Sequence, residues 1–170
     1  GVDRLADYIC ELGPSPADRP VAVTAGDRTV MIRPDPGEAP LLYVFKTVSD
    51  QYVGRISMFK VVSGTLRPDT TLRDTSSGAD ERLHALFHLH GPEQTQTNLL
   101  VAGDIGAVTK LTNAATGSTL TPVSQPVVIT PVALPLAHLA LALVPLTQSD
   151  DDKLSEALQR LTHEDPSLVV

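Results

Sequence analysis

The sequence contains no tryptophan, and only 4% of its residues are aromatic. Its core must therefore be built from small aliphatic side chains rather than from rings. Cysteine occurs once, at Cys10, which excludes an internal disulfide and favours a reducing, cytoplasmic compartment. The longest apolar run, from Val132 to Val144, is interrupted by Pro135 and His138 and is too short to cross a bilayer. The composition predicts an aliphatic protein without a membrane segment.

Positive charge is also scarce. The chain has 13 Lys and Arg residues against 20 Asp and Glu, which gives a net charge of −7. A free-standing binder of DNA or RNA normally carries a net basic balance or a concentrated basic face, so this class is disfavoured. The middle of the chain is less acidic than its ends, and its cations fit solvated strand edges, with a local RNA contact as the alternative. These cations are Lys46, Arg55, Lys60, Arg67, Arg73, Arg82 and Lys110.

Motifs that carry catalysis are missing. The sequence has no G-x-x-x-x-G-K-[ST] loop, no C-x-x-C, no H-E-x-x-H and no G-x-S-x-G. His84, His88 and His90 would project from one face of a strand because their numbers are all even. We interpret them as polar groups on a solvent face, and a metal site completed by Glu93 is the alternative. The sequence therefore predicts no catalytic, cofactor or metal site.

The first twenty residues predict a helix and a connector. Val2, Leu5, Ile9 and Leu12 recur at spacings of three and four, which is typical of an amphipathic helix. The helix should end at Gly13-Pro14, because the three prolines between residues 14 and 20 favour an extended chain. A helix this short is marginal unless it packs on a partner, so we expect its partner to precede Gly1 in a larger protein.

Short β-type runs separated by turn signals follow from residue 40 to about residue 122, and they predict a small barrel or sandwich. Residues 21–39 fit either a hairpin around Gly26-Asp27 or a loose insert. The expected strands are Leu41 to Val48, Gly54 to Ser63, Thr70 to Asp74, Glu81 to Leu89, Asp104 to Lys110, Thr119 to Leu120 and Val127 to Ile129.

The last forty residues predict the beginning of an α+β domain. Apolar residues alternate from Ala137 to Pro145, which favours a strand. A helix should begin at Ser149, where acidic residues suit its N-terminus, and end before Pro166. Ser167 to Val170 then resembles the start of another strand. One helix and two strands cannot close a core, so we expect the native chain to continue past Val170.

Several segments resemble elongation factor G and its paralogues among the translational GTPases. The second domain of that family is matched by residues 45–66, 81–90, 102–108 and 116–120. The opening of the third domain is matched by residues 140–145, 152–158 and 164–168, and the last helix of the GTPase domain by residues 1–16. No single motif carries the resemblance, which covers nearly the whole chain in the same order.

This resemblance implies a mainly β fold: a translation-factor-type β-barrel with an N-terminal helix and a partial C-terminal α+β, ferredoxin-like segment. Residues 1–20 would be the last helix of the GTPase domain and its linker, 21–131 the barrel, and 132–170 the start of domain III. GTP and magnesium would bind in the GTPase domain before Gly1, and no cofactor would bind in this chain.

The resemblance also implies a function. The chain would be a non-catalytic part of a GTP-dependent translocase that binds small-subunit ribosomal RNA and contacts its own GTPase domain. Tyr52, Gly54 and Arg55 in the first long turn, with Arg82 and His90 on a later strand, are the expected ribosome-facing residues.

Other functions stay open at this point. Gly91 to Gln96 depart from the family pattern, and residues 127–139 are unusually apolar. These departures favour a specialised paralogue, so a ribosomal-protection or ribosome-rescue GTPase is an alternative. A free-standing nucleic-acid-binding barrel or a structural adaptor is an alternative of another class.

Overall fold

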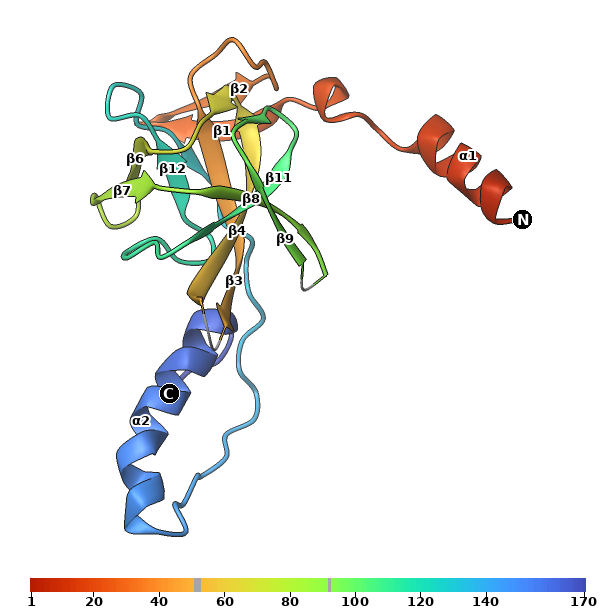
Figure 1. Cartoon of the computed structure of the whole chain (residues 1–170). Helices are drawn as coiled ribbons and strands as arrows, with labels where there is room; N and C mark the ends of the chain where they lie inside the picture. Colours follow the sequence, from red (N-terminus) through yellow and green to blue (C-terminus); the bar gives the residue numbers. More distant parts are fainter. Residues whose placement is uncertain (51–52, 92) are drawn as a thin grey trace.

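The computed structural model describes residues 1–50, 53–91 and 93–170. Figure 1 shows a curled β-barrel, with one helix before it in the chain and one after it. Helix α1 (Val2–Leu12) stands away from the barrel, and a linker containing the short helix η1 (Pro16–Asp18) joins the two. Helix α2 (Gln148–Glu164) lies beyond the tip of the longest hairpin.

An antiparallel sheet of eight strands forms the barrel wall, in the order β7-β6-β12-β3-β4-β11-β8-β9. The sheet curls because β7 and β8, which lie far apart in this order, are joined by only His84 and Ala85. The strands are β3 (Leu41–Asp50), β4 (Gly54–Ser63), β6 (Thr70–Asp74), β7 (Asp80–Leu83), β8 (Leu86–His90), β9 (Glu93–Thr97), β11 (Ile105–Thr109) and β12 (Thr119–Thr121).

The core inside this wall is aliphatic, as the composition predicts. Phe59 is its one fully buried aromatic side chain among the described residues, and leucines and valines surround it. Alternation explains this directly, since every second residue of a strand points inward. The inward leucines include Leu42, Leu72, Leu83 and Leu120.

A second, smaller sheet covers one side of the barrel. It joins β13 (Val128–Ile129), β1 (Val21–Ala25) and β2 (Arg28–Ile32), so residues 21–32 form the hairpin around Gly26, the first of the two alternatives that the sequence left open. Val23 and Ile129 pack with Leu41 and Val62 of the barrel in a second apolar cluster. The short strands β5 (Thr65–Leu66) and β10 (Leu100–Val101) form a two-stranded pair.

The predicted strand from Glu81 to Leu89 is wrong as a single element. It is two strands, because β7 pairs with β6 while β8 pairs with β11 and β9. The intervening residues cross from one half of the sheet to the other. The sequence does not predict strand β9, because its residues Glu93 to Thr97 are polar and show no apolar alternation.

The two strands expected near the C-terminus are also wrong. Residues 130–145 and 165–170 form no strand, and the side chains of Leu136, Leu139 and Leu141 are each 79% exposed. A strand needs an edge with which to exchange backbone hydrogen bonds, and no described strand pairs with either segment. Of the expected α+β segment, only the helix is formed.

Both helices have the expected character. Helix α1 is amphipathic, but none of its residues is buried, so its apolar stripe faces solvent. Helix α2 begins at Gln148, one residue earlier than expected, because Thr147 and Asp150 form a reciprocal capping box. No helix in the described part of the chain is long and apolar enough to span a membrane.

Candidate functional site

The expected ribosome-facing residues lie in three separate places. Gly54 and Arg55 begin β4, next to the tip of the β3–β4 hairpin. Arg82 lies on β7 at one end of the sheet order, and His90 ends β8 beside the other end. Tyr52 lies outside the described residues. The structure therefore brings Gly54 and Arg55 together and leaves Arg82 and His90 apart from them.

Arg55 makes contacts within the fold. Its Nη2 donates a hydrogen bond to the carbonyl of Leu111, and its own carbonyl accepts from the backbone N–H of Lys110 at 3.1 Å. Its side chain is half-buried, whereas its neighbour Gly54 is exposed with a φ of 84°. Arg55 thus fastens β4 to the segment that follows β11, and this contact occupies part of its guanidinium.

Arg82 belongs to an exposed charged cluster. Its Nη2 lies 3.0 Å from Asp69 Oδ1, and Nδ1 of His84 lies 3.2 Å from the same oxygen. The side chains of Arg82 and His84 are 58% and 64% exposed, so solvent or a partner can reach both. Asp69 has a φ of 64°, a left-handed conformation that Asp and Asn tolerate better than other non-glycine residues. We call Asp69, Arg82 and His84 the β7 cluster.

His90 lies at the tip of the β8–β9 hairpin, opposite Glu93. It is exposed, and Figure 1 shows that this hairpin projects from the side of the barrel. His84, in contrast, lies in the break between β7 and β8, so the three histidines do not share one strand. Within residues 1–50, 53–91 and 93–170, no three His, Cys, Asp or Glu side chains gather as ligands of a metal ion.

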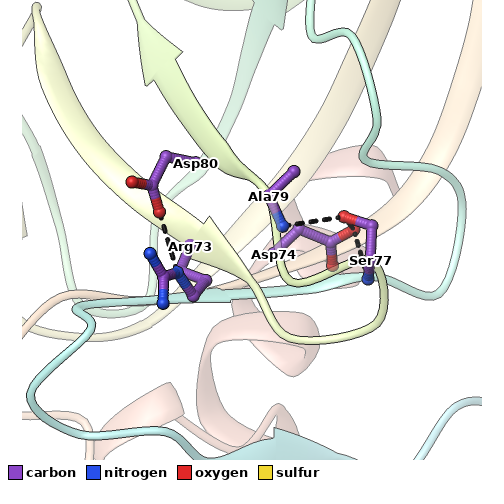
Figure 2. Close-up of polar contacts among 5 residues, drawn as sticks. All are labelled: Arg73, Asp74, Ser77, Ala79 and Asp80. Atoms are coloured by element: carbon purple, nitrogen blue, oxygen red, sulfur yellow. Dashed lines mark hydrogen bonds and ion pairs between the residues drawn. The ribbon is translucent and has the colours of Figure 1, made fainter.

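Two carboxylates are buried among the described residues, and each holds a turn or loop of the barrel by hydrogen bonds. The first is Asp74, at the end of β6. Figure 2 shows it beside Ser77, whose Oγ donates to Asp74 Oδ2 at 2.7 Å. Ser76 Oγ donates to the other oxygen at 2.7 Å. Burial would raise the pKa of Asp74, but the hydrogen bonds from Ser77 and Ser76 hold that pKa below its ordinary value. The ionised carboxylate organises the β6–β7 turn.

Acid should therefore weaken the barrel through Asp74. A folded-state pKa below the unfolded value, about 3.9, means that the stabilisation is present above that value and is lost as pH falls through the folded pKa. Urea unfolding at pH 6 and pH 3 should show a larger loss of unfolding free energy for the wild type than for Asp74→Asn.

The matched control for this pH experiment is Asp27→Asn, in the exposed turn between β1 and β2. This variant should keep the full acid sensitivity of the wild type. Equal pH dependence in Asp74→Asn and Asp27→Asn would contradict the role assigned to Asp74.

Asp80, the neighbour of this turn, forms an exposed ion pair. Arg73 Nε lies 2.8 Å from Asp80 Oδ1, and the two residues face each other across β6 and β7 (Figure 2). The hydrogen bond from Arg73 lowers the pKa of Asp80. Exposed pairs of this kind contribute little to stability, so we give it no larger role.

The second buried carboxylate, Glu81, ties β7 to the loop before β12. Its Oε1 accepts from the backbone N–H groups of Asn113 and of Ala114, the latter at 2.9 Å, and Oε2 accepts from Thr112 at 3.1 Å. Glu81 is only 3% exposed. Residues two apart on a strand share a face, so the inward-facing Leu83 is the sequence signal that Glu81 also points inward. No motif marks Glu81.

Helix α2 touches the barrel through Glu164. Its Oε1 accepts a hydrogen bond from the backbone N–H of Ser49 at 2.8 Å, near the end of β3. Strand β12 pairs with β3 only at Leu42 and Tyr43, so this part of β3 is an open edge on that side. Glu164 thus accepts a hydrogen bond from a part of β3 that β12 does not cover.

Two features of the chain bear on the expectation that GTP and magnesium bind outside it. The sequence lacks the phosphate-binding loop, and the acidic side chains that are buried among the described residues, Asp74 and Glu81, already accept several protein hydrogen bonds each. The absence of a nucleotide site from this chain stays a prediction.

Comparison with known proteins identifies the barrel. A family model described as elongation factor G domain 2 matches residues 41–123. A crystal structure of a Thermus thermophilus protein superposes with a TM-score of 0.77 and is 29% identical in sequence. The match covers 99% of this chain and 23% of the Thermus thermophilus chain.

Curated relatives extend the likeness to the whole chain. Elongation factor G of Karelsulcia muelleri is 34% identical, and that of Dehalococcoides mccartyi is 35% identical, each over 100% of this chain. Elongation factor G 1 of Syntrophomonas wolfei is 33% identical. This chain spans about a quarter of these relatives, at 25% or 26% of their length. Residues 41–123 are an elongation factor G domain 2, in a chain that is similar over its whole length to a part of elongation factor G.

Proposed function

We propose that this chain is the ribosome-binding and interdomain-coupling part of a GTP-dependent translation elongation factor that acts as a translocase in the cytoplasm. The observation that carries the proposal is the likeness, over the whole of this chain, to proteins named elongation factor G. The chain itself performs no catalytic step in this proposal. GTP and magnesium bind in the GTPase domain of the longer protein.

Residues 1–20, 21–131 and 132–170 belong to three successive domains in this proposal. The second apolar cluster supports the bounds of the middle domain, residues 21–131. Val23 and Ile129, near the two ends of this range, pack on the barrel residues Leu41 and Val62. The exposed apolar stripe of α1 supports its assignment to the preceding GTPase domain, which would cover that stripe.

Small-subunit ribosomal RNA is the proposed partner of the barrel surface. Gly54, Arg82 and His90 are exposed and able to meet a phosphate backbone. Arg55 supports the same surface from within, since its guanidinium holds Leu111. An RNA backbone attracts individual cations even when the whole chain is acidic, because salt screens charges more than about 10 Å away.

Coupling to the third domain runs through α2. The contact between Glu164 and Ser49 links the end of α2 to the hairpin that carries Gly54. A displacement of this hairpin would therefore displace α2, and a displacement of α2 would displace the hairpin. This linkage is the mechanical role proposed for the chain.

Altering the β7 cluster should change ribosome binding in both directions. Arg82→Gln removes one phosphate contact and should weaken co-sedimentation with small subunits, lowering the slope of log affinity against log salt by about one unit. Asp69→Asn should strengthen binding, because it frees Arg82 from its ion pair. Asparagine also tolerates the left-handed φ of residue 69, so the fold should persist.

The charge-matched control is Arg28→Gln in β2, which removes an exposed cation outside the proposed surface. Its affinity and salt slope should match those of the wild type. An equal loss in Arg28→Gln and Arg82→Gln would show that net charge, rather than the β7 cluster, governs binding.

A further inference from the structure

A cavity of about 230 Å³ lies where the linker after α1 meets the barrel. Linker residues 14–16 and 19–20 form one side, and Lys60, Val61, Val62 and Gly103 belong to the barrel side. Four prolines and three valines make most of the lining apolar. The cavity therefore has space and walls for a compact apolar group.

Both sides of the cavity are held in place. On the linker, Ser15 and Asp18 form a reciprocal capping box that fixes η1. On the barrel, the Gly103 N–H donates to the carbonyl of Val61 at 2.8 Å, and Gly103 has a φ of 101°. Two atoms of Pro16 lie 3.1 Å from where a Cβ on Gly103 would be, so the linker sits closely against this glycine. The cavity is thus preformed rather than a gap between loose segments.

The charged residues of the lining are Arg19 and Lys60, and both are positive. Neither forms an ion pair with another described residue. Lys60 is half-buried on β4, and Arg19 is exposed on the linker. Two cations without a carboxylate partner thus meet at one preformed cavity, although the chain has a net charge of −7.

Two acidic residues next to the lining, Asp18 and Asp104, form hydrogen bonds with backbone groups and no ion pair with Arg19 or Lys60. Asp18 Oδ2 accepts from the Ser15 N–H at 2.9 Å, and Asp104 Oδ2 accepts from the Val101 N–H at 2.8 Å. Both carboxylates therefore serve backbone donors of their own turns. The lining itself contains no carboxylate among the described residues, so its charge favours a negative ligand.

We propose that this cavity binds a small organic anion, a carboxylate or phosphate monoester with a compact apolar body. Arg19 and Lys60 hold the anionic group by charge-assisted hydrogen bonds, and the proline and valine walls cover the body. The lining does not include Gly54, Arg82 or His90, so this inference does not depend on the proposed ribosome surface.

Titration of the ¹⁵N-labelled chain tests the proposal. Benzoate and phenyl phosphate serve as anionic probes, benzyl alcohol as an uncharged probe, and inorganic phosphate as an anion without an apolar body. We expect saturable shifts at the amides of Ser15, Lys60 and Gly103 with the two organic anions. Arg19→Gln combined with Lys60→Gln should weaken their binding by about tenfold or more.

A matched double variant, Arg28→Gln with Lys46→Gln, removes the same charge from exposed sites outside the cavity and should bind the probes normally. Gly103→Ala would displace Pro16 and should also weaken binding without changing charge. Three results would overturn the proposal: no saturable shifts with either organic anion, equal loss in both double variants, or equal binding of benzyl alcohol or inorganic phosphate. The urea midpoint of each variant shows whether it is folded.

Discussion

Gly64→Ala is expected to lower the free energy of unfolding by about 2 to 5 kcal/mol. Gly64 follows β4 with a φ of 78°, and a Cβ there would lie 2.5 Å from both the Cα and the N of Pro40. These are backbone atoms, so no side-chain rotation can relieve the overlap. The turn also carries hydrogen bonds, because the Gly64 N–H donates to the carbonyl of Asp35 at 2.8 Å. Urea unfolding of the variant and the wild type measures the loss.

Gly78→Ala separates the overlap from the cost of backbone conformation. Gly78 has a similar φ of 73°, but a Cβ there would meet nothing within 4 Å. Its replacement should cost about 1 to 2 kcal/mol, the penalty for a left-handed residue alone. Equal losses in the two variants would show that the contact between Gly64 and Pro40 does not matter.

Glu81→Ala should cost about 3 kcal/mol, because three backbone N–H groups lose their acceptor at once. The backbone amide of Ala114 is buried and cannot form a replacement hydrogen bond with water, so it should account for the largest part of the lost unfolding free energy. Glu81→Gln keeps one acceptor oxygen and should cost less. Unfolding free energies of the three proteins, measured at the same pH, give this order.

Glu93→Ala is the control for Glu81, since Glu93 is an exposed glutamate on β9. Surface changes of this kind usually stay within about 0.5 kcal/mol of the wild type. A small effect of Glu81→Ala, close to that of Glu93→Ala, would contradict the structural role of the buried carboxylate.

The barrel strands can be predicted from sequence because alternation and turn residues are local signals. The predicted bounds of Gly54 to Ser63 and Thr70 to Asp74 are those that the structure has. The weakly marked hairpin at residues 21–32 also forms, and its pairing with β13 gives it a place in the fold. Such pairing across a hundred residues leaves no trace in local periodicity.

The predictions that fail depend on partners rather than on pattern. Residues 137–145 alternate as a strand should, but no described edge pairs with them. The break at His84 and Ala85 arises because β7 and β8 serve different neighbours. The role of Glu81 is hidden for a related reason: its amide donors come from residues about thirty positions later in the chain.

The candidate site can be predicted only in part. The structure places Gly54, Arg82 and His90 on the surface, and their ribosome-facing role stays a prediction; their separation on the sheet cannot be read from sequence. The hydrogen bond from Arg55 to Leu111 depends on the loop after β11 and is equally hidden. The ion pair between Arg82 and Asp69 is also hidden, and it provides the Asp69→Asn variant, which should bind small subunits more tightly than the wild type.

Salt-dependent co-sedimentation of the unaltered chain with purified small ribosomal subunits tests the central claim most directly. We expect the folded chain to bind at low salt and to be released as salt rises, because its contacts are to phosphates. The urea midpoint of the same sample shows that the barrel is intact. A folded chain that does not bind at low salt, or whose binding is indifferent to salt, would contradict the claim.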